Sequence, residues 1–417
     1  MSAPDDSAAA ARTFRAGLKN GAKVEPPQRG HSRGDFFVLD QGIFHKACGL
    51  GMRPAVALLV LTRFTGRNGT TTRASAHAIE QRTGIGRKAA ADAIEALVRA
   101  GIVTRSGSMT RPKYTIAQVV DTRLPLSPNQ AAALARALRG EKLSRSDNAL
   151  MGNVVLAGHA LRRDQRWEEV PPPDREPVWL PNALVDGIDG RESPVELVRQ
   201  TGDAMALRLL VDLYATHRLD EWGGINPKVV REEFREVFRH AVGTVFVLAF
   251  EPQRKAADWN SITEPHRAPP PETGRNLWER LNILQRFGLV HFVPHVLDGD
   301  GATAYPCSAA VGESDERELG VAARHAAEAL ILDVGDPASR AAFGDHFHKP
   351  GTVVVVVPRH MERASVVGIG RLKFRARTRA NTAWLTNLTE ISAKWLPIFA
   401  QMKSQHITRG HVGAKTG

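Results

Sequence analysis

Hydrophobic and polar positions between Thr72 and Ile116 change their period part-way along the segment. In the first part, apolar residues recur mostly at spacings of three and four, which is typical of one buried face on a helix. These residues are Ile79, Ala90, Ile94, Leu97 and Val98. After Gly101, apolar and polar residues alternate on both sides of Ser106–Met109, as they do in a β-hairpin. The pattern predicts two short helices around a Gly-Ile-Gly turn, followed by a hairpin.

A longer apolar run precedes this segment. The stretch RPAVALLVLTRFTGR has the apolar density of a buried helix, with Pro54 in its first turn, and it stops at Gly66 and Asn68. Ser75 or Thr72 is expected to cap the next helix, because a hydroxyl side chain there can accept a backbone N–H.

The same pattern occurs a second time. Shifting Arg87–Val103 by 187 residues lays it on Gly274–Val290, so that apolar residues fall on apolar residues and Gly101 falls on Gly288. A second hairpin is expected downstream, around Asp298–Gly301. Shorter upstream matches pair Ala57–Leu61 with Arg208–Asp212 and Phe37–Phe44 with Val178–Val185. The chain is therefore expected to contain one architecture twice.

These patterns predict a mixed α+β, helix-rich fold in five parts. The parts are a flexible basic arm at 1–34, a first domain at 35–125, a helical and Pro-rich linker at 126–176, a second domain at 177–310 with an insertion at 238–273, and a small C-terminal α/β region at 311–417. The linker is expected to be helical near Asn129–Arg139. The C-terminal region is expected to hold a helix at Leu319–Leu332, a buried strand in TVVVVVP and a basic strand in GRLKFRARTRA.

Basic charge gathers at the two ends of the chain. The net charge of +12 divides into +10 over residues 1–125, −7 over 126–358 and +9 over 359–417. The ends are therefore candidate surfaces for a polyanion, and the centre is expected to be a scaffold or a protein-contact surface.

Other classes of protein find little support in the sequence. The two cysteines, Cys48 and Cys307, do not form a disulfide framework, and no apolar run approaches the roughly 20 residues that span a bilayer. No Gly-rich loop of the Walker type is present, and His346 and His348 are followed at once by a turn rather than placed beside a tyrosine. We expect a cytoplasmic, nucleoid-associated protein that is not an enzyme and needs no cofactor or metal.

The segment Phe36–Ile116 resembles the winged helix-turn-helix superfamily in its short helix, tight turn, second helix and hairpin. The resemblance implies two winged helix-turn-helix domains, in which the second helix of each pair enters the major groove of double-stranded DNA and the hairpin, or wing, follows the backbone. If Ala90, Ile94 and Leu97 face the core, the opposite face of this helix points outward; it carries Arg87, Lys88, Ala91, Asp92 and Glu95. An outward carboxylate would have to read cytosine or hold an arginine in place.

Candidate DNA-contacting residues follow from these assignments. In the first domain they are Ser75, Arg87, Lys88, Ala91, Asp92, Arg105, Ser106, Ser108, Arg111 and Lys113; in the second, Arg275, Asn276 and Arg280; and on the basic strand, Lys373, Arg375 and Arg377. The wing cations are assigned mainly to phosphates. The second domain is expected to be the weaker DNA site, because Asp298 and Asp300 in its hairpin repel phosphate.

Three functions remain open at this point. The sequence favours a transcriptional regulator of a bacterial or mobile-element locus, acting as a homodimer or oligomer on DNA. The tandem arrangement is also similar to plasmid replication initiators with two winged-helix domains, which usually make the main DNA contact through the second. A third alternative is a scaffold whose winged helices contact proteins only.

Overall fold

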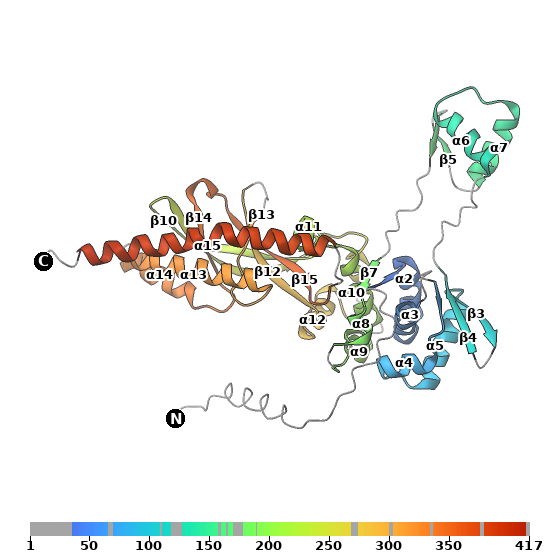
Figure 1. The fold of residues 1–417 in the computed structure, drawn as a ribbon, viewed down its shortest axis with the longest axis horizontal. Coiled ribbons are helices and arrows are strands. Elements are labelled where there is room, and N and C mark those ends of the chain that lie inside the picture. Colours follow the sequence, from blue (N-terminus) through green and yellow to red (C-terminus); the bar gives the residue numbers. More distant parts are fainter. Residues whose placement is uncertain are drawn as a thin grey trace. The chain divides into compact units, whose positions relative to one another are not determined.

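The computed structural model describes residues 36–65, 70–108, 111–117, 127–156, 160–163, 166–169, 178–188, 190–267, 274–299, 303–333, 337–375 and 379–413. They form a mixed α/β fold of helices and antiparallel sheets (Figure 1). The predicted basic arm at 1–34 lies outside these ranges. Among the described residues, no helix combines the length and the apolar character needed to cross a membrane.

The first repeat follows the predicted order of helices and strands. Its elements are β1 (Phe36–Leu39), α2 (Gln41–Gly49), α3 (Met52–Arg63), β2 (Thr71–Thr72), α4 (Ala76–Thr83), α5 (Arg87–Arg99), β3 (Val103–Ser108) and β4 (Arg111–Ile116). The prediction of a buried helix with Pro54 in its first turn is confirmed, since Pro54–Thr62 of α3 are all buried. The short strand β2 was not predicted; it pairs with β4, giving a three-stranded sheet of order β2-β4-β3.

The second repeat begins with the same kinds of element. It contains β7 (Val178–Pro181), α8 (Ala183–Asp186), α9 (Pro194–Gln200), α10 (Ala204–Ala215), β8 (His217–Arg218), α11 (Leu219–Trp222), β9 (Gly224–Ile225), β10 (Arg231–Val242), β11 (Val245–Ala256), the 3-10 turn η1 (Glu264–His266), α12 (Leu277–Arg286) and β12 (Val290–Leu297). The matched stretches therefore lie in corresponding elements: β1 with β7, α3 with α10, and α5 with α12.

The ends of α5 and α12 show how closely the repeats agree. Gly101 and Gly288 both have positive φ, 69° and 64°. After each glycine, the next residue donates its N–H five positions back, Ile102 to Leu97 at 3.0 Å and Leu289 to Leu284 at 2.9 Å. This is the Schellman motif, which turns the chain from the helix into the following strand.

The two repeats are joined by a strand pair and by polar contacts. β1 and β7 are antiparallel, with Phe37 opposite Leu180 and Leu39 opposite Val178. Asp212 on α10 is fully buried and accepts hydrogen bonds from α2 of the first repeat, from Gln41 at 2.7 Å and His45 at 2.6 Å. Side chains from both repeats consequently share one hydrophobic core.

Residues between the repeats form a module with a core of its own. The predicted helix is α6 (Pro128–Leu138), and it is followed by α7 (Arg145–Leu156), β5 (Ala160–Arg163) and β6 (Arg166–Glu169). The buried side chains of the two helices pack together as a separate cluster; they are Ala133, Leu134, Ala137, Met151 and Val154. We call these four elements the inserted module. The Pro-rich stretch 170–177 lies outside the described residues.

The last third of the chain completes a six-stranded sheet. Its strands run in the order β13-β12-β15-β10-β11-β14, where β13 is Thr303–Pro306, β14 is Val353–Pro358 and β15 is Ser365–Leu372. The predicted second hairpin is confirmed as β12 and β13. Because β15 pairs with both β12 and β10, the expected boundary at 310/311 runs through this sheet. The order β10-β15-β12 parallels β2-β4-β3 of the first repeat, although its middle strand comes from much later in the chain.

Three helices pack against this sheet: α13 (Ser314–Asp333), α14 (Pro337–Phe347) and α15 (Arg379–Gly413) (Figure 1). The predicted helix near Leu319–Leu332 and the strand in TVVVVVP are confirmed by α13 and β14. Trp384 and Trp395 of α15 are buried. The predicted basic strand is wrong in extent, because β15 ends at Leu372 and neither Lys373 nor Arg375 is part of it.

Candidate nucleic-acid interface

The turn between α4 and α5 is fixed by a glycine and by two buried side chains. Gly84 ends α4 in the left-handed conformation, with φ 63°, and its N–H bonds Glu80 O at 2.9 Å. Thr83 and Ile85, on either side of it, are buried. These contacts hold the first turn of α5 at a defined angle to α4.

The two faces of α5 are those expected from the sequence. Ala90, Ala93, Ile94 and Leu97 are buried in the core. The opposite face is exposed, and it carries Arg87, Lys88, Ala91, Asp92 and Glu95. At the N-terminal end of this face, two cations and a methyl group lie next to one another.

Arg87 is held in place by α4. Its side chain is 65% exposed, and its guanidinium lies 2.9 Å from His77 Nδ1 and 3.3 Å from a carboxylate oxygen of Glu80. The hydrogen bond from His77, together with Arg87, keeps the pKa of Glu80 below its usual value. Neither supporting residue was predicted, although a His and a Glu three positions apart on the first helix of the pair are a signal for such a contact.

The hairpin adds hydroxyls and cations beside this helix. Ser106, Ser108 and Lys113 are exposed, and Ser106 lies opposite Lys113 in the ladder. Arg111 lies in β4 opposite Ser108. Gly107 has φ 86°, a conformation that glycine adopts without strain.

Arg105 is held by the helix rather than left free. Its guanidinium binds the Glu95 carboxylate of α5 and lies 5.7 Å from the centre of the Tyr114 ring. The outward carboxylate of Glu95 therefore holds an arginine, one of the two roles expected for it. Ser75 occupies the N-cap position of α4, but its exposed side chain does not make the expected capping hydrogen bond.

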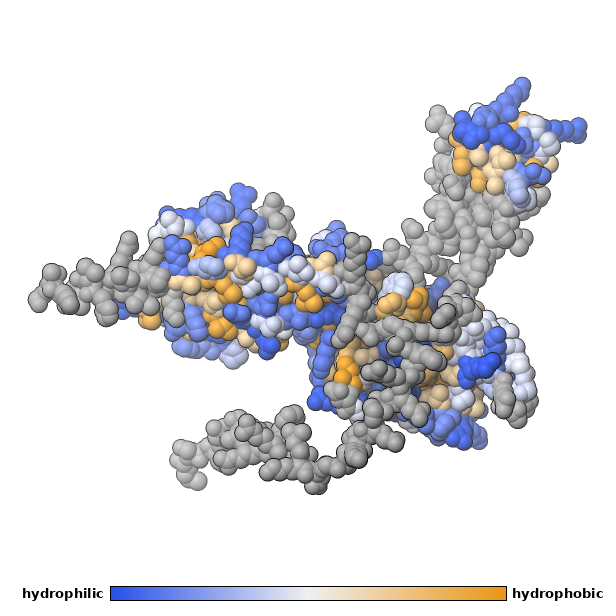
Figure 2. Space-filling model, in the orientation of Figure 1, coloured by the Kyte–Doolittle hydropathy of each residue, from blue (hydrophilic) through white to orange (hydrophobic). Residues whose placement is uncertain are grey.

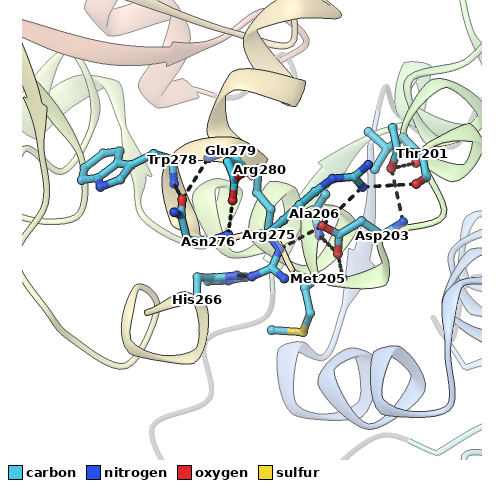
Figure 3. A network of polar contacts seen from close by, with 11 residues as sticks. Thr201, Asp203, Met205, Ala206, His266, Arg275, Asn276, Trp278, Glu279 and Arg280 are labelled. Atoms are coloured by element: carbon cyan, nitrogen blue, oxygen red, sulfur yellow. Dashed lines mark hydrogen bonds and ion pairs between the residues drawn. The ribbon is translucent and has the colours of Figure 1, made fainter. Parts of the chain in front are cut away.

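The second repeat does not present the arginine that the sequence assigned to DNA. Arg280 is completely buried, and its Nε donates to Asp203 at 3.0 Å while Nη1 contacts His266 Nδ1 at 3.1 Å (Figure 3). Its assignment as a DNA contact is wrong, because the guanidinium is enclosed between α10, η1 and α12. Burial, reinforced by the neighbouring positive charge of Arg280, lowers the pKa of His266 to about 4.

The other two assigned residues of this repeat have structural partners. Asn276 is the N-cap of α12, and its side chain accepts from Trp278 and Glu279 while the Glu279 carboxylate accepts from the Asn276 N–H. Arg275 donates to Thr201 O at 3.3 Å (Figure 3). The outer face of α12 is also covered in part, since Lys255 of β11 bonds Asn282 at 2.8 Å and contacts Gln285.

The C-terminal cations do not form a cationic strand face. Lys373 and Arg375 follow the end of β15, and Arg375 binds Glu313 and lies 5.8 Å from the Trp384 ring. Arg377 lies outside the described residues. The adjacent Arg371, on β15, is buried against Glu316 at 2.5 Å.

His346, weighed as half of a metal-binding pair, lies at the end of α14 rather than on a strand. Its Nδ1 lies 2.8 Å from a Glu251 oxygen, and Lys349 binds the same oxygen at 2.8 Å. The contact with Glu251 accounts for the position of His346 without a metal ion.

Comparison of the chain with protein-family models, with curated proteins and with solved structures finds no match. The exposed end of α5 offers two cations, a methyl group and a carboxylate, with the hairpin beside it. Such a surface can bind phosphates through its cations and contact base edges through Arg87, Lys88 and Ala91.

Proposed function

We propose that the protein binds double-stranded DNA sequence-specifically and that residues 52–117 are a winged helix-turn-helix module. The observation that carries the proposal is the exposed N-terminal face of α5, with Arg87, Lys88 and Ala91, at the second helix of a tight helix pair. The element order α3-β2-α4-α5-β3-β4 and the sheet order β2-β4-β3 are those of this superfamily. The net charge of +10 over residues 1–125 favours a polyanion as the partner.

Within this proposal α5 enters the major groove and the hairpin lies along the backbone. Arg87 is presented by His77 and Glu80, so little side-chain freedom is lost when it meets a base or phosphate. Arg105 is braced in the same way by Glu95. Lys88 and Lys113 extend the positive surface on either side.

We further propose that the protein acts as a transcriptional regulator rather than a replication initiator. Initiators of the tandem type usually make their main DNA contact through the second winged helix. Here Arg280, the arginine of the second repeat that the sequence assigned to DNA, is buried, and the outer face of α12 is partly covered by Lys255. The second repeat is therefore better suited to hold the first in position than to read DNA.

The first experiment is selection of bound sequences from a random duplex pool, followed by titration of the selected site by fluorescence anisotropy. Arg87→Ala and Lys88→Ala should each weaken specific binding by about 1–3 kcal/mol, or roughly 5- to 150-fold, if each side chain contacts a base. Repeats spaced along a selected footprint would instead favour the initiator.

The double variant Arg87→Ala with Lys88→Ala is compared with a control variant that removes the same amount of charge elsewhere. Arg254→Ala with Lys349→Ala also removes two exposed cations, 69% and 52% exposed and each paired with a glutamate, from the six-stranded sheet region. It should bind the selected site within about twofold of the unaltered protein, because surface charges outside an interface act weakly. Equal affinities of the Arg87/Lys88 double variant and the unaltered protein would refute the site. A pool that yields no enriched sequence would refute the function.

A further inference from the structure

The inserted module has the element order of the proposed DNA-binding module on a smaller scale. A helix pair, α6 and α7, is followed by an antiparallel hairpin, β5 and β6, as α4 and α5 are followed by β3 and β4. Trp167 of β6 packs against the helix core, together with Leu143 and Leu150. Helices and hairpin thus form one packed unit, where the sequence indicated only a linker.

The first turn of α7 is fixed by a reciprocal cap. Ser144 Oγ accepts the Asp147 N–H at 3.1 Å, and a carboxylate oxygen of Asp147 accepts the Ser144 N–H at 3.2 Å. Arg136 of α6 binds the other oxygen of Asp147, and these contacts, led by the one from Arg136, hold the pKa of this carboxyl below its usual value. Arg145 and Ser146 are consequently exposed at the first two positions of α7, where α5 has Arg87 and Lys88.

The charge of this surface is positive once internal pairs are counted. Arg136 is neutralised by Asp147, and Arg139 is neutralised by Glu141 at 2.6 Å. Lys142 and Arg145 are exposed, and neither forms an ion pair with another side chain that the structure describes. Figure 2 shows hydrophilic side chains on the surface of this module. The loop before α7 and the first residue of this helix therefore offer one cation each to a partner.

We propose that the inserted module is a second duplex-DNA-binding module, which grips the sugar-phosphate backbone through Lys142 and Arg145. The inference rests on the proposed function and extends it from one contact surface to two. Phosphate contact, rather than base reading, is assigned because the neighbouring polar groups are already engaged: Ser146 bonds Ser144 at 2.8 Å and Asn148 donates to Ser144 O at 3.0 Å. Lys142 and Arg145 are left to act as charges.

The chain length between the modules permits both to contact one duplex. Ten residue steps join Ala117 to Ser127, and a fully extended chain of this length spans at most about 36 Å. This reach is close to one helical turn of DNA, roughly 34 Å. The second contact would raise affinity by making its own binding intramolecular.

The test measures affinity against salt concentration for the full chain on two 40-base-pair duplexes, one carrying the selected site and one of random sequence. Each phosphate contact contributes about −0.9 to the slope of log affinity against log salt. Lys142→Ala with Arg145→Ala should therefore flatten the slope by about 1.8 and weaken binding to both duplexes by the same factor. The charge-preserving exchange, Lys142→Arg with Arg145→Lys, should keep the slope of the unaltered protein.

Each outcome separates this inference from the function on which it rests. If the unaltered protein binds the selected duplex and the Lys142/Arg145 double variant keeps the same slope, the second contact is refuted and the proposed function stands. If only discrimination between the two duplexes is lost, α7 reads bases and the backbone assignment is refuted. If the unaltered protein binds neither duplex, both proposals fail.

Discussion

Arg280 shows what spacing alone leaves undecided about a single residue. It lies between Leu277 and Leu281 on α12, at the border of the buried stripe, where an arginine can face either way. Its partner Asp203 is 77 residues earlier in the chain. That carboxylate also caps α10 by accepting from Met205 at 3.0 Å, so one charge serves two structural purposes. No local pattern contains this information.

We expect Arg280→Ala to destabilise the fold by about 3–5 kcal/mol, because the buried Asp203 carboxylate loses its close partner and keeps only the Arg275 guanidinium, 3.9 Å away. Chemical denaturation gives the free energy of unfolding. Arg286→Ala, at an exposed position of the same helix, is the matched control and should change stability by less than about 0.5 kcal/mol. If Arg280→Ala kept its stability but lost affinity for DNA, the assignment of Arg280 as a buried structural residue would be wrong.

At the scale of elements, short-range pattern predicted the first repeat apart from the short strand β2, and it was insufficient for the second repeat. Periodicity located α5 and its two faces, and alternation located β3 and β4, because each of these elements packs against neighbours close in sequence. The role of β15 could not be predicted from local pattern. This strand lies between β10 and β12 in the sheet, but α13, α14 and β14 separate it from β12 in the sequence. The contact between Arg87 and His77 could have been predicted from the sequence, because both residues belong to the same helix pair. The contact of Lys255 with α12 could not, because it depends on the position of the β10–β11 hairpin.

The glycines that end α5 and α12 give an element-scale prediction. A side chain at Gly101 or Gly288 would meet nothing within 4 Å, so only the left-handed backbone opposes it. Gly101→Ala and Gly288→Ala should each cost about 1–2 kcal/mol in the free energy of unfolding. Gly86→Ala is the control: its φ is −54° and its surroundings are equally open, so alanine should be tolerated there. Unequal costs at Gly101 and Gly288 would contradict the equivalence of the two helix ends.

At the scale of the whole molecule, stability depends on histidines that must stay neutral. His266 lies beside Arg280, and His295 on β12 contacts the Arg371 guanidinium at 3.1 Å. Burial, reinforced in each case by the adjacent arginine, lowers the pKa of His266 to about 4 and that of His295 to about 3. Both folded-state values lie below the unfolded value of about 6.5.

The unfolded chain therefore takes up more protons than the folded one as the pH falls below 6.5. Stability should decrease from pH 6.5 to 5 with a slope of up to about 1.4 kcal/mol per pH unit for each of the two histidines. Measuring the free energy of unfolding against pH tests this. His266→Gln should remove one share of the slope, whatever its effect on absolute stability, and His77→Gln, at an exposed position, should leave it unchanged. An unaltered slope in His266→Gln would show that this imidazole is not held neutral.

Strand β1 can pair with β7 only after the residues between them have been synthesised. Leu39 leaves the ribosome 139 residues before its partner Val178. At 5–20 residues per second the interval is roughly 7–28 s. During that time the edge of β1 that pairs with β7 has no partner strand, whereas the buried cluster of the inserted module is already present in full. We therefore expect the first repeat to present an unpaired strand edge, the kind of edge that favours aggregation, until the second repeat has been translated.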